Sequence, residues 1–257
     1  MIIAVIIAAA VLGGSISALF ISGGPSTEKT THINRESKYV CVVYFTYIGC
    51  PNCAVTDPIV LSKWIKEDPR LVIIEYGWRK GDWSHPNAKV AGEYAESYHS
   101  QAAVPQLIVS KSRIWLGRED VPSAEPYIKN LKSNLCPLVK GSAPIEDLNI
   151  KELPGLPKIW SNNRVLVSLG NGSWIIGWNG TPAKAGDAGE KKMTVKELKS
   201  LLFVDDVATA LKGYDYTVVG SIMVPFSGSA FPKEMGFVRG AVFKNAVRVD
   251  LADLPGS

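Results

Sequence analysis

The sequence is poor in the residues that most often hold metal ions. Its 257 residues include four cysteines, three histidines and four methionines, and no histidine follows His99. A four-ligand zinc site needs two closely spaced pairs of Cys or His, and only one such pair is present. The absence of a methionine cluster near that pair also argues against a copper site. The composition therefore gives little support to metal chemistry, and the second half of the chain has no evident catalytic cluster.

The chain also lacks clustered charge and internal repeats. Charged residues make up 20% of the sequence, and the net charge of +4 is dispersed. A nucleic-acid partner is therefore not expected, because such proteins gather Lys and Arg on one face. Hydrophobic residues make up 46% of the chain, which at this length predicts a sizeable core in one or two globular domains.

The most informative motif is Cys50-Pro51-Asn52-Cys53. An apolar, strand-like run occupies residues 39–45, and a helix is predicted over residues 51–67. Cys50 then lies at the helix N-terminus, where free backbone N–H groups and the helix dipole stabilise a thiolate, and Pro51 suits the first helical position. Two cysteines at this spacing can also bind a metal or form an inert staple. The context favours a redox-active dithiol.

Two prolines extend the pattern around the motif. Pro58 lies five residues after Cys53 and should kink the predicted helix. Val104-Pro105 directly precedes a short apolar run at residues 106–109. A strand, a Cys-x-x-Cys motif, a helix with this proline and a later Val-Pro together resemble the thioredoxin superfamily over residues 38–136. The dipeptide between the cysteines departs from those of thioredoxins, glutaredoxins and periplasmic disulfide oxidases, so the resemblance defines no subclass.

The resemblance implies a role for each of four residues. Cys50 is expected to be the exposed, attacking thiol, and Cys53 the buried thiol that resolves a mixed disulfide. Val104 and Pro105 are expected to face the dithiol and to bind substrate, and the bond between them is expected to be cis. The resemblance implies neither a cofactor nor a metal.

The two remaining cysteines are predicted to be isolated structural bystanders. Cys41 lies in the strand-like run, where a free cysteine packs as a small apolar residue, and Cys136 directly precedes Pro137. Neither is expected to take part in exchange chemistry.

The predicted fold class is α/β, with a thioredoxin-like fold in residues 38–136 whose central mixed sheet is flanked by helices. Strands at residues 39–45 and 71–76 are expected to pair in parallel through the helix between them, and residues 106–116 to form an antiparallel hairpin. The helices of this domain are predicted over residues 51–67, 87–99 and 124–135.

The first 21 residues carry no charged side chain. As a helix, residues 1–21 are just long enough to cross a bilayer core of about 30 Å at about 1.5 Å per residue. They are predicted to be a transmembrane anchor followed by a stalk over residues 22–37, with a cleaved signal peptide as the alternative. The basic residues behind the segment mildly favour the opposite topology. Exchange chemistry is needed most outside the cytoplasm, however, so an extracytoplasmic catalytic domain is expected.

Residues 137–157 are rich in proline and are predicted to link the first domain to an accessory domain over residues 158–257. That domain is expected to be α+β or mostly β. Asn171-Gly172 predicts a hairpin turn within it, because both residues readily adopt positive φ. Its strands and one helix are predicted over residues 164–169, 173–178, 195–211 (the helix), 216–224 and 237–249.

The leading functional hypothesis is a membrane-tethered thiol-disulfide oxidoreductase. Its dithiol is expected to exchange disulfides with protein substrates and to depend on a redox partner that the sequence does not identify. Two alternatives are a non-catalytic thioredoxin-like scaffold with a stapled Cys50-Cys53 pair, and a carrier of a soft metal such as copper.

Overall fold

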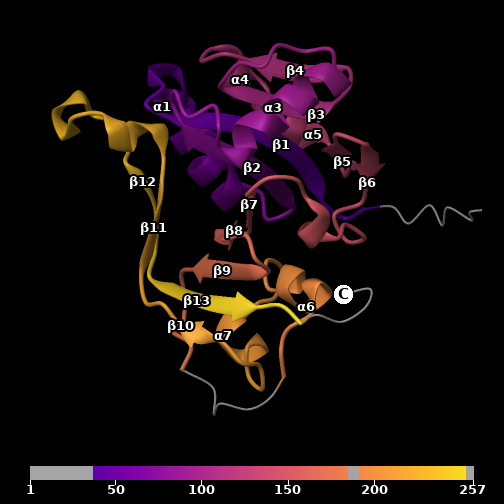
Figure 1. Ribbon diagram of the computed structural model, residues 1–257, viewed down its shortest axis with the longest axis vertical. Helices are drawn as coiled ribbons and strands as arrows, with labels where there is room; N and C mark the ends of the chain where they lie inside the picture. Colours follow the sequence, from indigo (N-terminus) through magenta and orange to yellow (C-terminus); the bar gives the residue numbers. More distant parts are fainter. Residues whose placement is uncertain (1–36, 185–190, 253–257) are drawn as a thin grey trace, which may run out of the picture. The chain divides into compact units, whose positions relative to one another are not determined.

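A mixed sheet of nine strands dominates the structure, a computed structural model that describes residues 37–184 and 191–252. The strand order is β10-β13-β9-β8-β7-β2-β1-β3-β4 (Figure 1). These strands are β1 (Val40–Ile48), β2 (Leu71–Arg79), β3 (Gln106–Ser110), β4 (Arg113–Leu116), β7 (Lys158–Ser161), β8 (Arg164–Ser168), β9 (Ser173–Trp178), β10 (Thr217–Val218) and β13 (Asn245–Asp250). Two small sheets are formed by β5 (Cys136–Leu138) with β6 (Gly141–Ala143), and by β11 (Ile222–Pro225) with β12 (Gly240–Phe243).

The helices are short compared with the sheet. The α-helices are α1 (Pro51–Pro58), α2 (Ile65–Glu67), α3 (Pro86–Ser97), α4 (Asp120–Ser123), α5 (Glu125–Asn130), α6 (Val195–Ser200) and α7 (Val207–Ala210). A π-helical segment, η1 (Ile59–Trp64), joins α1 to α2. The 3₁₀ helices are η2 (Ile150–Glu152), η3 (Ser227–Ala230) and η4 (Lys233–Met235).

Strands β1 and β2 lie side by side in the interior of the sheet, next to the motif. Most of their side chains are buried on both faces, which is typical of parallel strands covered by other elements. They pair in parallel from Val40 opposite Leu71 to Ile48 opposite Arg79, and α1, η1 and α2 form the connection, as predicted. The predicted hairpin of β3 and β4 is also confirmed, and β3 pairs antiparallel with β1.

Two hydrophobic cores lie on opposite faces of these strands. On one face the rings of Phe45, Tyr76 and Tyr94 pack together, with centroids 5.2 to 6.0 Å apart. Tyr94 belongs to α3 and is fully buried. On the other face η1 and the strands β11 and β12 cover the sheet, with the Trp160 and Phe243 rings 5.9 Å apart.

The second half of the chain extends this same sheet. Strand β7 pairs antiparallel with β2, and residues 35–257 form one compact unit. The predicted fold class, a thioredoxin-like fold with a separate accessory domain, is therefore wrong, because the described chain is mostly β and built on one large sheet. The backbone groups at the free edge of β2 require partners. Strand β7 provides these partners. Its Lys158 lies opposite Glu75 of β2, although 83 residues separate the two in the sequence.

Several predicted elements are interrupted in the structure. The helix predicted over residues 51–67 changes to π-helical geometry directly after Pro58, where the proline cannot donate a backbone hydrogen bond. The helix predicted over residues 124–135 ends at Asn130, and the one predicted over residues 195–211 divides into α6 and α7. The predicted hairpin between β8 and β9 is confirmed, and Asn171 has a φ of 45° there.

The predicted membrane segment, residues 1–21, and most of the predicted stalk lie outside the described residues. Within residues 37–184 and 191–252, no helix has the length and apolarity needed to cross a membrane. A transmembrane helix is therefore not part of the described fold, and the predicted fold class is corrected on this point as well.

A hairpin from the second half of the chain reaches helix α1. We call residues 222–243 the C-terminal arm; it consists of β11, η3, η4 and β12. It runs from the region of β10 and β13 to α1 (Figure 1), and η3 contacts both α1 and β1. The Phe226 ring anchors it, with its centroid 6.3 Å from that of Trp160. The arm thus brings residues from the second half of the chain to the Cys-x-x-Cys motif.

Candidate dithiol site

The motif occupies the turn between β1 and α1. Gly49 has a φ of +95°, a conformation that favours glycine, and it turns the chain out of the strand. Cys50 follows as the N-cap residue of α1, and its Sγ accepts a hydrogen bond from the backbone N–H of Cys53 at 3.1 Å. Pro51 is the first helical residue, as predicted. The local sequence therefore positions the Cys50 sulfur over the helix N-terminus.

Both cysteines of the motif are free thiols, and both are buried. Cys53 is fully buried, as expected, but only 5% of Cys50 is exposed, so the prediction of an exposed Cys50 is wrong. The physical reason is that its sulfur folds back over the first helical turn to accept the Cys53 N–H. The residues between the two cysteines, Pro51 and Asn52, are exposed and carry the motif to the protein surface.

The two thiols have opposite acid strengths. A hydrogen bond from the Cys53 thiol lowers the pKa of Cys50 to about 7, and backbone N–H groups of the first turn act in the same direction. Burial raises the pKa of Cys53, and the interactions with Cys50 and Asp57 raise it further. Above about pH 7 the pair therefore carries one negative charge, on Cys50.

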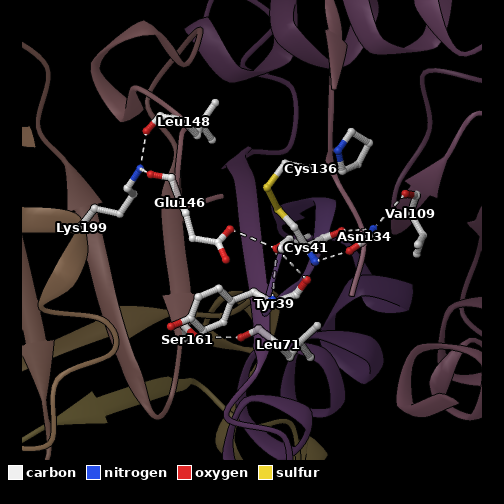
Figure 2. The surroundings of a disulfide bond; sticks show 12 residues. Tyr39, Cys41, Leu71, Val109, Asn134, Cys136, Glu146, Leu148, Ser161 and Lys199 are labelled. Atoms are coloured by element: carbon white, nitrogen blue, oxygen red, sulfur yellow. Dashed lines mark hydrogen bonds between the residues drawn. A yellow bond between two sulfur atoms is a disulfide. The ribbon is translucent and has the colours of Figure 1, made fainter. Parts of the chain in front are cut away.

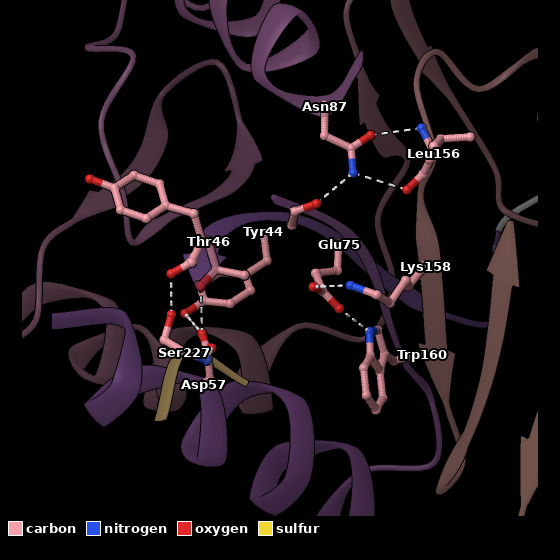
Figure 3. Close-up of polar contacts among 11 residues, drawn as sticks. Tyr44, Thr46, Asp57, Glu75, Asn87, Leu156, Lys158, Trp160 and Ser227 are labelled. Carbon is pink, nitrogen blue, oxygen red and sulfur yellow. Dashed lines mark hydrogen bonds and ion pairs between the residues drawn. The ribbon is translucent and has the colours of Figure 1, made fainter. Parts of the chain in front are cut away.

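A buried carboxylate lies beneath the dithiol. Asp57 is only 1% exposed and accepts hydrogen bonds from the Tyr44 hydroxyl at 2.9 Å, the Thr46 hydroxyl at 2.7 Å and the Ser227 backbone N–H at 2.8 Å (Figure 3). Burial raises its pKa to about 7, although these donors lower it. The sequence reasoning missed Asp57. A local signal was present, because Asp57 follows Cys53 by four residues and so lies on the same helix face.

A second buried polar group lies next to this carboxylate. Glu75 of β2 is ion-paired with Lys158 at 2.6 Å and accepts a hydrogen bond from the Trp160 indole at 2.7 Å (Figure 3). Gly77 leaves room for that pair, since a Cβ there would lie 2.4 Å from a Glu75 carboxylate oxygen. Asp57 and Glu75 both line a cleft of about 350 Å³ at the carboxyl ends of β1 and β2. The cleft gives this polar region access to solvent.

The predicted substrate-binding residues lie at the same end of the sheet as the motif. Phe45 pairs with Gln106 as the last residue pair of β1 and β3, which places Val104 and Pro105 beside the end of β1 that leads into Cys50. The Val104–Pro105 bond is cis, as predicted. The Pro105 carbonyl accepts a hydrogen bond from the Gly117 N–H at 2.9 Å. Their role in substrate binding stays a prediction.

The other two cysteines form a disulfide. Cys41 and Cys136 are bonded with an S–S distance of 2.06 Å and are separated by 95 residues in the sequence (Figure 2). The expectation that they are isolated is therefore wrong. Asn134 bonds to both backbone groups of Cys41, accepting from its N–H at 2.6 Å and donating to its carbonyl at 2.8 Å. This arrangement brings the segment before β5 against β1 and closes the distance between the two sulfurs.

No group of three or more His, Cys, Asp or Glu side chains with the geometry of a metal site occurs in the part of the chain that the structure describes. Comparison with known proteins gives no match: no family model matches the chain, and no match was found among curated proteins or among solved structures. The functional argument therefore rests on the chemistry of the site.

Proposed function

We propose that the protein is a thiol-disulfide oxidoreductase that acts through Cys50 and Cys53. The observation that carries the proposal is the contrast in acid strength between two adjacent free thiols, one with a pKa of about 7 and one with a raised pKa. A thiolate that forms near neutral pH is the attacking species in disulfide exchange, and a neighbouring protonated thiol resolves the mixed disulfide. A purely structural cysteine pair has no need of this asymmetry.

The proposed reaction transfers two electrons. In the reductive direction, the Cys50 thiolate attacks one sulfur of a substrate disulfide, whose S–S bond breaks as the Cys50–substrate bond forms. The other substrate sulfur leaves as a thiolate and takes a proton from solvent. Cys53 then loses its proton and attacks Cys50 Sγ, which releases the second substrate thiolate and leaves a Cys50–Cys53 disulfide. A dithiol redox partner restores the two thiols, and oxidation of a substrate follows the same steps in reverse.

Asp57 is suited to accept the proton that Cys53 loses. The two residues lie one turn apart on the same face of α1, and they interact electrostatically. A carboxylate with a pKa of about 7 can accept and return a proton at neutral pH, which suits a reaction that runs in both directions. The cleft lined by Asp57 offers this proton a path to solvent.

We propose protein disulfides and thiols as substrates, and a location outside the cytoplasm. The Cys41–Cys136 disulfide supports that location, since structural disulfides persist mainly in oxidising compartments. The membrane anchor at residues 1–21, or a cleaved signal peptide there, stays a prediction that is consistent with export.

The proposal is tested by the reduction of insulin disulfides with the full-length protein and dithiothreitol as the reductant. We expect wild-type protein to accelerate the reaction, Cys50→Ser to abolish the acceleration, and Cys53→Ser to accumulate mixed disulfides. Wild-type protein that adds nothing to dithiothreitol alone contradicts the proposal and favours the scaffold. Stoichiometric Cu(I) binding without turnover favours the metal carrier instead.

A further inference from the structure

Ser227 of the C-terminal arm makes two hydrogen bonds at the dithiol site. Its backbone N–H donates to Asp57 Oδ2 at 2.8 Å, across 170 residues of sequence. Its hydroxyl donates to the carbonyl of Tyr47, across 180 residues. Ser227 itself is only 1% exposed. A single residue of the C-terminal arm therefore contacts both Asp57, beneath the motif, and β1, the strand that leads into the motif.

The Tyr47 carbonyl belongs to the turn that positions the attacking cysteine. It accepts a hydrogen bond from the Cys50 N–H at 3.3 Å in addition to the bond from Ser227. Tyr47 and Cys50 are the two ends of this turn, and Gly49 lies between them with positive φ. The hydroxyl of Ser227 thus restrains the same carbonyl that closes the turn.

The arm holds Ser227 in place by apolar packing and by close backbone contacts. Phe226 packs on Trp160, and its N–H donates to the Arg239 carbonyl at 2.9 Å. A Cβ at Gly228 would lie 2.2 Å from the Val238 carbonyl oxygen, so the two sides of the arm approach too closely for a side chain there. These contacts hold the arm in addition to the bond from Ser227 to Asp57.

We propose that Ser227 is a positioning residue of the dithiol site, which orients Asp57 through its N–H and the Cys50 turn through its hydroxyl. This inference rests on the proposed function. With this role for Ser227, the C-terminal arm belongs to the exchange site. The second half of the chain is then needed for the chemistry of Cys50 and Cys53.

The N–H of Ser227 acts on Asp57 together with the other groups that face it. It lowers the pKa of Asp57, against the larger effect of burial, because it stabilises the charged form. The remaining groups that contact or influence Asp57 are Tyr44 and Thr46 of β1, Glu75 of β2 with its partner Lys158 of β7, and Cys50 and Cys53 of α1. A substitution at residue 227 leaves the chemical identity of all these groups unchanged.

The backbone at Ser227 allows a test with proline. Ser227 is the first residue of the 3₁₀ helix η3, a position whose φ suits proline. The preceding residue, Phe226, has φ −97° and ψ 168°, which is the extended conformation that a following proline requires. Ser227→Pro therefore removes the N–H and the hydroxyl with little change of the backbone, but its ring Cδ takes the direction of the lost N–H and displaces the Asp57 carboxylate from residue 227. Ser227→Ala removes the hydroxyl alone and is the matched control.

The experiment measures the pKa of Asp57 by the pH dependence of its side-chain carboxyl ¹³C chemical shift in the full-length protein. We expect Ser227→Pro to raise the pKa of Asp57 by about one to two, because the charged carboxylate loses a hydrogen bond that stabilises it. Ser227→Ala keeps that N–H and should leave the pKa of Asp57 unchanged. In insulin reduction, we expect the pH profile of Ser227→Pro to move in the same direction. Ser227→Ala should lower the rate at all pH values without moving the profile.

Three outcomes separate the proposals. An Asp57 titration that is the same in wild-type and Ser227→Pro protein overturns the role of Ser227, whatever the exchange activity. A displaced pH profile that persists when Ser227→Pro is combined with Asp57→Asn also overturns it, because the effect then does not pass through Asp57. Absence of turnover in the wild-type protein overturns the proposed function and leaves the titration result to be judged separately.

Discussion

The two cysteine pairs of this protein lie in or next to strand β1, but they differ in almost every other respect. Cys41 lies inside the strand and is bonded to Cys136, and both are fully buried. Cys50 and Cys53 lie just beyond the strand end, are free, and have backbone N–H groups and a carboxylate around them. The difference shows that the surroundings of a cysteine, and not its presence in the sequence, decide between a structural bond and a free thiol.

The largest expected effect concerns the structural pair. Replacing both Cys41 and Cys136 by alanine should lower the free energy of unfolding by about 4 to 5 kcal/mol, because the disulfide closes a loop of nearly a hundred residues in the unfolded chain. Guanidinium unfolding of the full-length protein measures this loss. Insulin reduction by the folded variant should proceed at the wild-type rate. A clear decrease in that rate would mean that the two pairs are chemically coupled and would break the comparison.

The next effect concerns Asp57 and the pH dependence of stability. Its pKa is raised from 3.8 to about 7 in the folded protein, so the folded state binds this proton more tightly than the unfolded state. The contribution of Asp57 to stability is therefore largest below about pH 4 and falls as the pH rises to about 7, by about 4 kcal/mol at about 1.4 kcal/mol per pH unit. Asp57→Asn should remove this loss, so that it is more stable than wild type at pH 8.

Asparagine can satisfy the hydrogen bonds at this position. Its carbonyl oxygen can accept the Ser227 N–H, and its amide can donate to the Tyr44 and Thr46 hydroxyl oxygens. The measurement is the difference in unfolding free energy between Asp57→Asn and wild type at a series of pH values from 4 to 8. A difference that does not change with pH would show that Asp57 ionises as an ordinary surface carboxylate does.

The smallest effect concerns the reactivity of the first thiol. With a pKa of about 7 instead of 9.0, half of Cys50 is ionised at pH 7, about fifty times the fraction of an ordinary thiol. Alkylation of the reduced protein by iodoacetamide should therefore show a midpoint near pH 7 and label Cys50 alone. The low exposure of Cys50 slows the reaction but leaves the midpoint unchanged. Labelling of Cys53 first, or a midpoint near pH 9, would reverse the assigned roles.

Local sequence signals predicted the parts of the site that local structure builds. The β1–α1 turn, Pro51 at the first helical position and the β3–β4 hairpin each depend on residues close in sequence. Asp57 carried a local signal too, its spacing from Cys53, and was missed because acidic residues on helices are usually solvated.

The parts that could not be predicted depend on contacts between distant segments. Strand β7 occupies the edge of β2, the Cys41–Cys136 bond spans 95 residues, and Ser227 reaches Asp57 across 170. Each contact forms only after the chain has folded back on itself, so no sequence window contains both partners. The fold class was wrong for this reason: the resemblance over residues 38–136 could not indicate that later strands continue the same sheet.

The bond between Ser227 and Asp57 also has a consequence for the order in which the protein is made. A ribosome adds about 5 to 20 residues per second, so Ser227 is synthesised roughly ten to thirty seconds after Asp57, given their separation of 170 residues. During that interval a nascent chain can already contain the whole Cys-x-x-Cys helix, but Asp57 lacks its backbone donor and the Cys50 turn lacks its restraint. The surroundings of the dithiol are therefore completed late in synthesis, and a chain released early would carry both cysteines without the two hydrogen bonds from Ser227.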